Sequence, residues 1–149
     1  MTIDMKTTFP RPAGHHSITP GFSIPNAAKV IAFAEKAFGA KVLERYDGPN
    51  GQVGHAELLI GDSVVMLGDA MEAPMPAQLS YYVANGDLVD ATYRKALEAG
   101  ATSINEPKNQ FYGYRSACIR DAGGNRWTIC AIVEQLTQDE IVRRMKDMK

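Results

Sequence analysis

Three histidines are the side chains best suited to proton transfer, and they occur at two places in the chain. His15 and His16 are neighbours in a polar N-terminal segment, and His55 alternates with Val53 and Glu57 in an extended stretch. An imidazole ordinarily titrates near neutral pH and can serve as acid or base. Adjacent side chains of an extended chain point in opposite directions, so His15 and His16 cannot bind one metal ion together without a bend. His55 is therefore a candidate for ligand contact or proton transfer, and exposure to solvent is the alternative.

Two further stretches place polar side chains on one face of a predicted strand. Gln78, Ser80 and Tyr82 alternate in one of them, and Thr19 lies in the other. If these faces line a cavity, they would orient a ligand through hydrogen bonds, although they contain no strong base or nucleophile. The alternative is that one or both faces contact water.

A loop combines aromatic residues with a nearby cation. Phe111 and Tyr112 lie in the loop, and Arg115 follows shortly after it. This combination could close over a planar or anionic ligand. The alternative is that the aromatic side chains fill the edge of a core. Trp127, farther along the chain, is expected to pack under a helix.

These residues are distributed over two similar halves. Each half is predicted to contain one strand, one helix and three strands, which indicates an internal repeat. The predicted strands are 17–24, 41–45, 52–60, 63–67, 78–83, 101–105, 114–120 and 126–132, and the helices are 26–39 and 87–99. Asn26 is expected to cap the first helix, and Gly39 and Gly100 to end the two helices.

The segments outside the repeat have distinct roles. Met, Ala and Pro dominate the stretch between the halves, which suits a connector. After the second half, 138–148 has apolar residues recurring on one side of a predicted helix, and Thr137 with Glu140 forms a capping box. This last helix is expected to pack on the body of the protein or on a partner.

Composition narrows the class of protein. The chain has 149 residues, of which 45% are apolar and 22% charged, with a formal net charge of -1, as expected for one globular domain without a nucleic-acid-binding surface. It shows neither a signal peptide nor a membrane-spanning stretch, so a cytoplasmic protein without membrane contact is expected. The two cysteines, Cys118 and Cys130, are expected to be free buried thiols.

Several motifs together resemble the vicinal oxygen chelate superfamily, which contains glyoxalases, bleomycin-resistance proteins and dioxygenases. They are the paired βαβββ pattern and the stretches 55–58, 61–67, 110–113 and 126–128. The chain is most similar to the glyoxalase-like branch formerly labelled demethylubiquinone methyltransferase-like. The resemblance implies an α+β fold in which two βαβββ modules form a curved, mostly antiparallel eight-stranded sheet around a ligand pocket, with the helices outside. It implies one domain over 1–149, with module one at about 16–69, a linker at 70–77, module two at 78–134 and a C-terminal helix at 137–148.

The resemblance also indicates where a metal ion would be bound. The four ligand positions of the metal-dependent members correspond approximately to Thr19, Met66, Gln78 and Thr128, and of these only Gln78 is a credible ligand. A shift of one or two residues would bring His16 into the first position. We therefore expect no metal or other cofactor, and retain Thr19, Gln78 and Thr128 as candidate ligand contacts. Relatives commonly have Pro and His in the turn before the last strand, and this chain does not.

Three functions are consistent with this sequence. One is metal-independent binding of a small organic molecule in a cupped pocket, as in the drug-resistance members, and this one is favoured. Another is a metal-dependent lyase, transferase or dioxygenase of the same superfamily. The third is a metal-free enzyme that uses His55 or Tyr112, for which the sequence reveals no oriented partner. A homodimer is expected, because a second copy would cover the open sheet edges and the linker.

Overall fold

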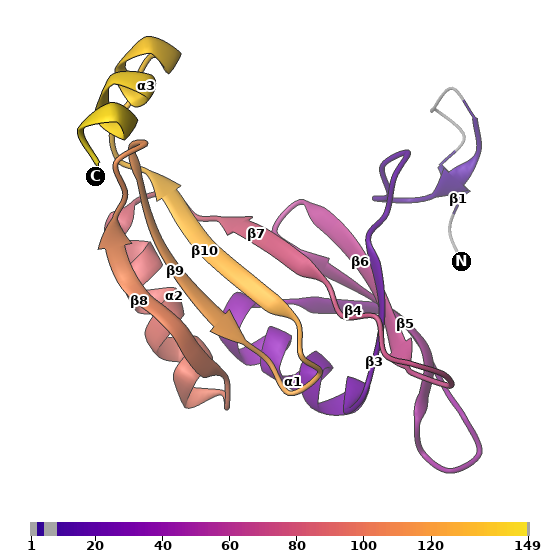
Figure 1. The fold of residues 1–149 in the computed structure, drawn as a ribbon. Coiled ribbons are helices and arrows are strands. Elements are labelled where there is room, and N and C mark those ends of the chain that lie inside the picture. The colour runs from indigo at the N-terminus through magenta and orange to yellow at the C-terminus, as the bar shows by residue number, and fades with distance from the viewer. Residues whose placement is uncertain (1–2, 5–8, 149) are drawn as a thin grey trace.

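The computed structural model describes residues 3–4 and 9–148, and it confirms two consecutive βαβββ modules followed by a C-terminal helix (Figure 1). Module one consists of β3 (Gly21–Ile24), α1 (Ala27–Phe38), β4 (Lys41–Asp47), β5 (Val53–Ile60) and β6 (Ser63–Asp69). Module two consists of β7 (Gln78–Tyr82), α2 (Gly86–Glu98), β8 (Thr102–Asn109), β9 (Tyr114–Arg120) and β10 (Arg126–Ile132). The final helix is α3 (Gln138–Asp147), and a short hairpin of β1 (Ile3–Asp4) and β2 (Arg11–Pro12), not predicted from the sequence, precedes module one.

Each module forms its own four-stranded sheet with the same strand order. The orders are β3-β6-β5-β4 and β7-β10-β9-β8. In each sheet the first strand pairs in parallel with the last, and all other pairs are antiparallel. The strand pairing is thus mostly antiparallel, as predicted. The eight strands form two four-stranded sheets, one in each module. An isolated bridge between Ser23 and Met75 joins the linker to the edge of β3.

The first strand is shorter than its sequence pattern indicates. The prediction was 17–24, whereas β3 begins at Gly21, directly after Pro20. Proline has no N–H to donate to a strand ladder, so regular pairing starts after it. Thr19 therefore lies before the strand and not within it.

The beginning of α1 is stabilised differently from the prediction. Asn26 occupies the N-cap position with φ 60°, but its side chain makes no capping hydrogen bond and donates instead to the carbonyl of Ala122 (3.0 Å). The carboxylate of Asp69, at the end of β6, accepts from the N–H of Ala27 (3.1 Å) and from that of Val53 (2.7 Å). A residue far along the chain thus binds the free N–H at the helix start. Gly39 ends the helix in the left-handed conformation, as predicted.

One hydrophobic core extends through both modules. Helix α1 packs on β5 and β6, α2 packs on β8, β9 and β10, and the two helices contact each other. At the centre, the rings of Phe38 and Trp127 are 4.8 Å apart between centroids, and Phe22 approaches Trp127 edge-on at 6.5 Å. Trp127 is buried beneath α1, as expected. The core therefore holds the two modules together.

The described part of the chain contains no helix long and apolar enough to cross a membrane. Cys118 and Cys130 are both free and buried, in agreement with the prediction.

Candidate functional site

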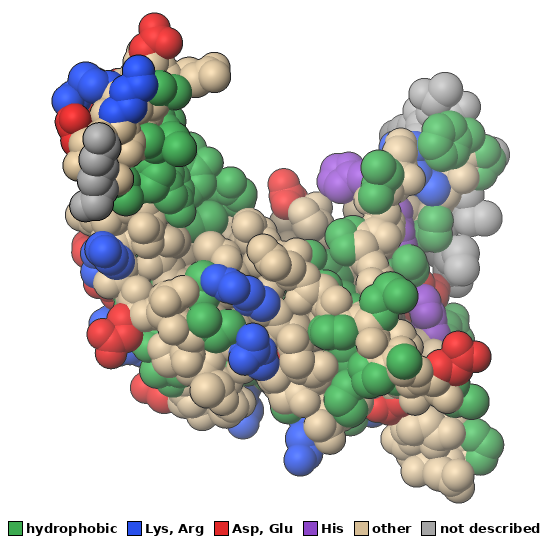
Figure 2. Space-filling model, viewed as in Figure 1, with side chains coloured by type: hydrophobic (Ala, Val, Ile, Leu, Met, Phe, Trp, Pro, Cys, Tyr) green, Lys and Arg blue, Asp and Glu red, His purple; other side chains and the backbone are tan. Residues whose placement is uncertain are grey.

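Within the described part of the chain, both sheets have one face that no helix covers. Because α1 and α2 pack on the core side, the opposite faces are open (Figure 1). In the space-filling view the surface is hollowed between the end that carries α3 and the N-terminal segment, and hydrophobic side chains gather on the inner side of the α3 end (Figure 2). These open faces are the surfaces on which a ligand could lie without displacing a helix.

On the open face of module one, a carboxylate lies between two histidines. The Nε2 atom of His15 is 2.5 Å from one oxygen of Glu57, and the Nε2 atom of His55 is 3.1 Å from the other. The Nδ1 atom of His15 in turn lies 3.0 Å from the hydroxyl of Thr19. We name these four residues the His–Glu–His cluster; it brings together two predicted site residues, Thr19 and His55.

Local irregularities in the strand explain how the cluster forms. A register shift between β4 and β5, opposite Gly54, breaks the predicted alternation, so Val53 lies in the core while His55 and Glu57 share the open face. The N-terminal segment then crosses this face and places His15 against Glu57. The sequence analysis did not identify a hydrogen-bond partner for His55. The position of Glu57, two residues away on the same strand face, could have indicated this contact.

Burial distinguishes the members of the cluster. The side chains of His15 and Glu57 are 6% and 7% exposed, whereas that of His55 is 42% exposed. Burial raises the pKa of Glu57, but the hydrogen bonds and electrostatic interactions with His55 and His15 together lower it by more, so the net pKa lies below the ordinary value of a glutamate. Glu57 is therefore a buried carboxylate that stays ionised near neutral pH.

A cleft of about 520 Å³ lies at the junction of the two modules. The β5–β6 turn borders it on one side and β7 on the other, with Trp127 among the lining residues. Its polar groups include the side chains of Asp62, Ser63, Ser80 and Tyr82. Two of the predicted contacts, Ser80 and Tyr82, thus line a cavity of the size that small organic ligands occupy.

A series of aromatic contacts on module two begins at Tyr82, one of the residues that line the cleft. Tyr82 contacts Tyr114 edge-on, with 5.9 Å between ring centroids and 3.3 Å between the hydroxyls. Tyr112 makes edge-on contacts with Tyr114 and with Phe111, each with 5.2 Å between ring centroids. The hydrogen bond with Tyr114 raises the pKa of Tyr82 to about 12, so its hydroxyl stays protonated and can donate.

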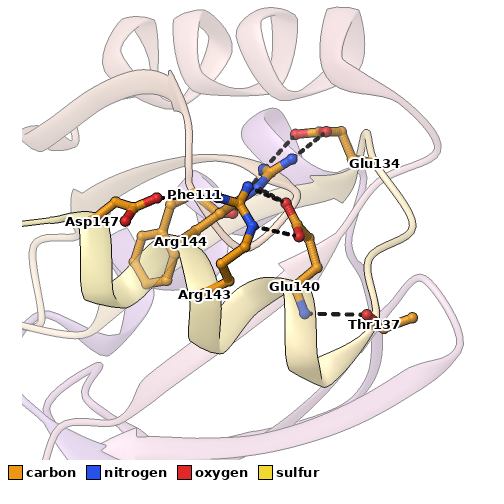
Figure 3. Close-up of polar contacts among 7 residues, drawn as sticks. All are labelled: Phe111, Glu134, Thr137, Glu140, Arg143, Arg144 and Asp147. Carbon is orange, nitrogen blue, oxygen red and sulfur yellow. Dashed lines mark hydrogen bonds and ion pairs between the residues drawn. The ribbon is translucent and has the colours of Figure 1, made fainter.

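The C-terminal helix positions the aromatic loop (Figure 3). Arg144 donates to the carbonyl of Phe111 (3.0 Å) and pairs with both oxygens of Glu134 (3.1 Å each), so α3 is joined to the loop by one side chain. Thr137 accepts from the N–H of Glu140, as predicted, but the Glu140 carboxylate binds Arg143 and Arg144 instead of completing a capping box.

The remaining predicted residues lie apart from these groups. Arg115 forms a bidentate pair with Asp90 of α2 (2.8 and 3.0 Å), on the helix side of its sheet. Gln78 is exposed at the start of β7. The hydroxyl of Thr128 lies 3.3 Å from the thiol of Cys118.

The four positions at which the superfamily binds metal do not form a suitable ligand set in this chain. Thr19 and Thr128 are engaged with His15 and Cys118, Met66 offers only a thioether, and Gln78 alone cannot hold an ion. Within residues 9–148, no group of three or more His, Cys, Asp or Glu side chains is arranged to hold a metal ion. No chemical step in this protein is therefore assigned to a metal of the family type.

The turn between β9 and β10, where relatives commonly have Pro and His, has a structural role. The buried Asp121 carboxylate accepts hydrogen bonds from Gly123, Asn125 and the indole of Trp127. Asn125, which is fully buried, accepts from the N–H of Ala77 in the linker (2.8 Å). This turn thus fixes Trp127, one wall of the cleft, and holds the linker in place.

Comparisons with known proteins agree with this architecture. Residues 15–129 match the glyoxalase/bleomycin resistance protein/dioxygenase superfamily. An uncharacterized protein of Mycobacterium bovis is 32% identical over 139 residues, covering 87% of this chain and 91% of its own length. An uncharacterized protein of Mycobacterium tuberculosis has the same identity over 82% of its length.

Solved structures show the same fold at lower sequence identity. TioX from Micromonospora sp. ML1 superposes with a TM-score of 0.62 at 20% identity, covering 82% of this chain and all of that one. A glyoxalase/bleomycin resistance protein/dioxygenase family enzyme from Burkholderia phytofirmans PsJN has a TM-score of 0.63 at 20% identity, covering 75% of this chain and 94% of that one. The chain therefore belongs to the glyoxalase/bleomycin resistance protein/dioxygenase superfamily, also called the vicinal oxygen chelate superfamily.

Proposed function

We propose that this protein binds a small organic molecule in the cleft between its two modules, without a metal of the family type. The observation that carries the proposal is the cleft of about 520 Å³ between the β5–β6 turn and β7. Ligand pockets are typically apolar with a few well-placed polar groups. Here Leu79, Tyr81 and Trp127 supply apolar surface, and the hydroxyls of Ser80 and Tyr82 supply hydrogen bonds.

The lining favours a flat molecule with a hydrogen-bond acceptor. Tyr81, Tyr82 and Trp127, all from module two, offer aromatic surface to a ligand. Tyr82 stays protonated because its hydrogen bond with Tyr114 raises its pKa to about 12. The carboxylate of Asp62 at the rim disfavours ligands with a negative charge at that end. We therefore propose a neutral or singly charged aromatic compound.

We further propose that the protein acts as a homodimer. Val42 and Leu43 are 39% and 43% exposed on β4, an edge strand, and Met71 and Met75 of the linker are 89% and 72% exposed. A second copy that covers these surfaces would remove both an open strand edge and exposed apolar side chains from water. Light scattering at micromolar concentration should give twice the chain mass, and a monomer mass would contradict the proposal.

Fluorescence provides a direct test of binding, because Trp127 is the only tryptophan of the chain and lines the cleft. We expect the neutral aromatic probe N-phenyl-1-naphthylamine to quench Trp127 emission saturably. Ser80→Phe, which fills the cleft, should weaken this quenching about tenfold or more. The matched control is Ser17→Phe, at an exposed position that does not line the cleft. Equal quenching in both variants would refute the assignment of the cleft.

Native mass spectrometry of freshly purified protein complements this test. A co-purified compound would be seen as a mass increment in the wild type that is reduced in Ser80→Phe. Elemental analysis of the same sample would show whether a stoichiometric metal accompanies the compound, in which case the metal-dependent alternative would replace the present proposal.

A further inference from the structure

We propose that His55, oriented by Glu57, is a metal-independent general base that removes a proton from a planar carbon acid. The site is the open face of module one, where the His–Glu–His cluster lies. None of the residues lining the cleft between the modules belongs to this cluster, so the inference does not depend on ligand binding there.

The hydrogen bonds of the cluster determine which nitrogen of each histidine carries a proton. An ionised carboxylate can only accept, so both contacts of Glu57 require an N–H at Nε2 of His15 and of His55. The Nδ1 atom of a neutral His15 then accepts from the hydroxyl of Thr19. For a neutral His55, the same assignment leaves the lone pair on Nδ1.

The free nitrogen of His55 is the one that can react. Its Nδ1 makes no hydrogen bond to any residue in the described part of the chain, and the side chain is 42% exposed. Catalytic histidines are commonly oriented by a carboxylate on one ring nitrogen while the other takes the proton. Here Glu57 orients His55. Glu57 is itself held by a hydrogen bond with His15, which is in turn hydrogen-bonded to Thr19.

Neighbouring groups suit proton transfer to His55. The ring of Tyr46 on β4 lies nearly parallel to it, at 6.4 Å between centroids and 25° between planes, and offers a stacking surface for a planar substrate. The charged and titratable groups around His55 are Glu57 on its own strand, Tyr46 and Glu44 on β4, and His15 on the N-terminal segment. Of these, Glu57 contacts the ring directly and can hold the imidazolium that forms when His55 accepts a proton.

The reaction step is a simple proton transfer. The lone pair of Nδ1 forms a bond to the acidic hydrogen, the C–H electron pair moves toward the adjacent electron-withdrawing group, and His55 becomes an imidazolium. Returning the proton to carbon or to oxygen regenerates the neutral base, so no oxidant, reductant or metal is needed.

Metal chelation is a poorer account of the same residues. His15 and His55 contact different oxygens of Glu57, so the carboxylate fills the space between the two imidazoles and the donors do not converge on one point. A chelate would need at least three donors directed at a common centre.

The test uses 5-nitrobenzisoxazole, a planar carbon acid. Removal of its C3 proton breaks the N–O bond and yields a coloured cyanophenolate. The assay is run on the intact protein with EDTA present. We expect turnover that rises with pH to a plateau, falls about tenfold or more in His55→Ala, and is unchanged in His16→Ala, which removes an exposed histidine outside the cluster. Glu57→Gln should lower kcat more than it raises KM, because the carboxylate orients the His55 ring and acts on the base, not on the substrate.

Two results would overturn the proposal. One is equal turnover by the wild type and His55→Ala, with melting curves confirming that both are folded. The other is turnover that EDTA abolishes and added Zn(II) restores. Because the fluorescence titration reports on the cleft and this assay on His55, failure of one leaves the other interpretable.

Discussion

Replacement of Asp121 by alanine tests whether the β9–β10 turn is the rigid support of the cleft wall. The Asp121 side chain is buried and accepts four hydrogen bonds, two from backbone N–H groups, one from the Asn125 amide (2.9 Å) and one from the Trp127 indole (2.8 Å). Asn125 and Trp127 are themselves buried, so their donors would lose their partner in a dry environment.

The expected loss of stability is large for a single substitution. Each buried donor left without an acceptor costs about 1–3 kcal/mol, and partial entry of water reduces the sum. We therefore expect Asp121→Ala to lower the free energy of unfolding by about 3–5 kcal/mol. In a domain of this size, each kcal/mol of lost stability lowers the melting temperature by about 2–4 °C. The expected fall in the melting temperature of Asp121→Ala is therefore roughly 6–20 °C.

Thermal unfolding followed by circular dichroism measures this change, and Trp127 emission provides a second signal from the same turn. The matched control is Asp62→Ala, since Asp62 lies in an exposed turn and, among residues 3–4 and 9–148, accepts only from the neighbouring Ser63 hydroxyl (2.8 Å). That control should change the free energy of unfolding by less than about 0.5 kcal/mol. A fall of under about 2 °C in Asp121→Ala would refute the reasoning, since it would imply that the buried donors find other partners.

Three further predictions concern the cluster, the last helix and metal ions. Glu57 has a lowered pKa in the folded protein, so its contribution to stability is present above pH 4.5, the ordinary pKa of a glutamate, and is lost as the pH falls through the folded pKa. In urea unfolding, the difference in unfolding free energy between wild type and Glu57→Gln should therefore shrink as the pH is lowered below 4.5. A difference that stays constant with pH would contradict this. Arg144→Ala should release α3 to proteolysis with little change in melting temperature. Arg143→Ala should leave α3 protected, because the polar contacts of Arg143 with described residues, to Glu140 and Asp147, lie within α3. Adding Ni(II) or Zn(II) should leave the melting temperature unchanged, because a real site at a hundredfold excess over Kd would add about 2.7 kcal/mol. A metal-induced rise that disappears in Gln78→Ala would restore the metal-dependent alternative.

Local sequence patterns predicted the repeated architecture well. Alternating apolar residues, helical periodicity and glycine at helix ends act over a few residues, so the order of elements and the stop at Gly39 follow from short windows. The same reasoning placed Ser80 and Tyr82 on one face of β7, and the structure confirms this alternation.

Contacts between distant segments could not be predicted in this way. Asp69, far along the chain, accepts the hydrogen bond from the N–H at the start of α1. His15 contacts Glu57 because the N-terminal segment crosses the sheet, and the path of that segment depends on turns and on Pro20. Arg115 illustrates the same limit, because its pairing with Asp90 depends on how α2 lies on β9. These contacts result from packing, which periodicity alone does not encode.

The parallel pairing of first and last strands has a consequence for how the chain folds. β3 cannot find its neighbour until β6 has been synthesised, and β7 must likewise wait for β10. Until then Phe22 and Ile24, both fully enclosed in the finished protein, stay exposed on a strand without a partner. Closing such loops before any favourable contact forms slows folding and prolongs the interval in which apolar strands can associate with other chains. Each module should therefore form as a late, cooperative event, with β6 and β10 as the strands whose arrival completes it.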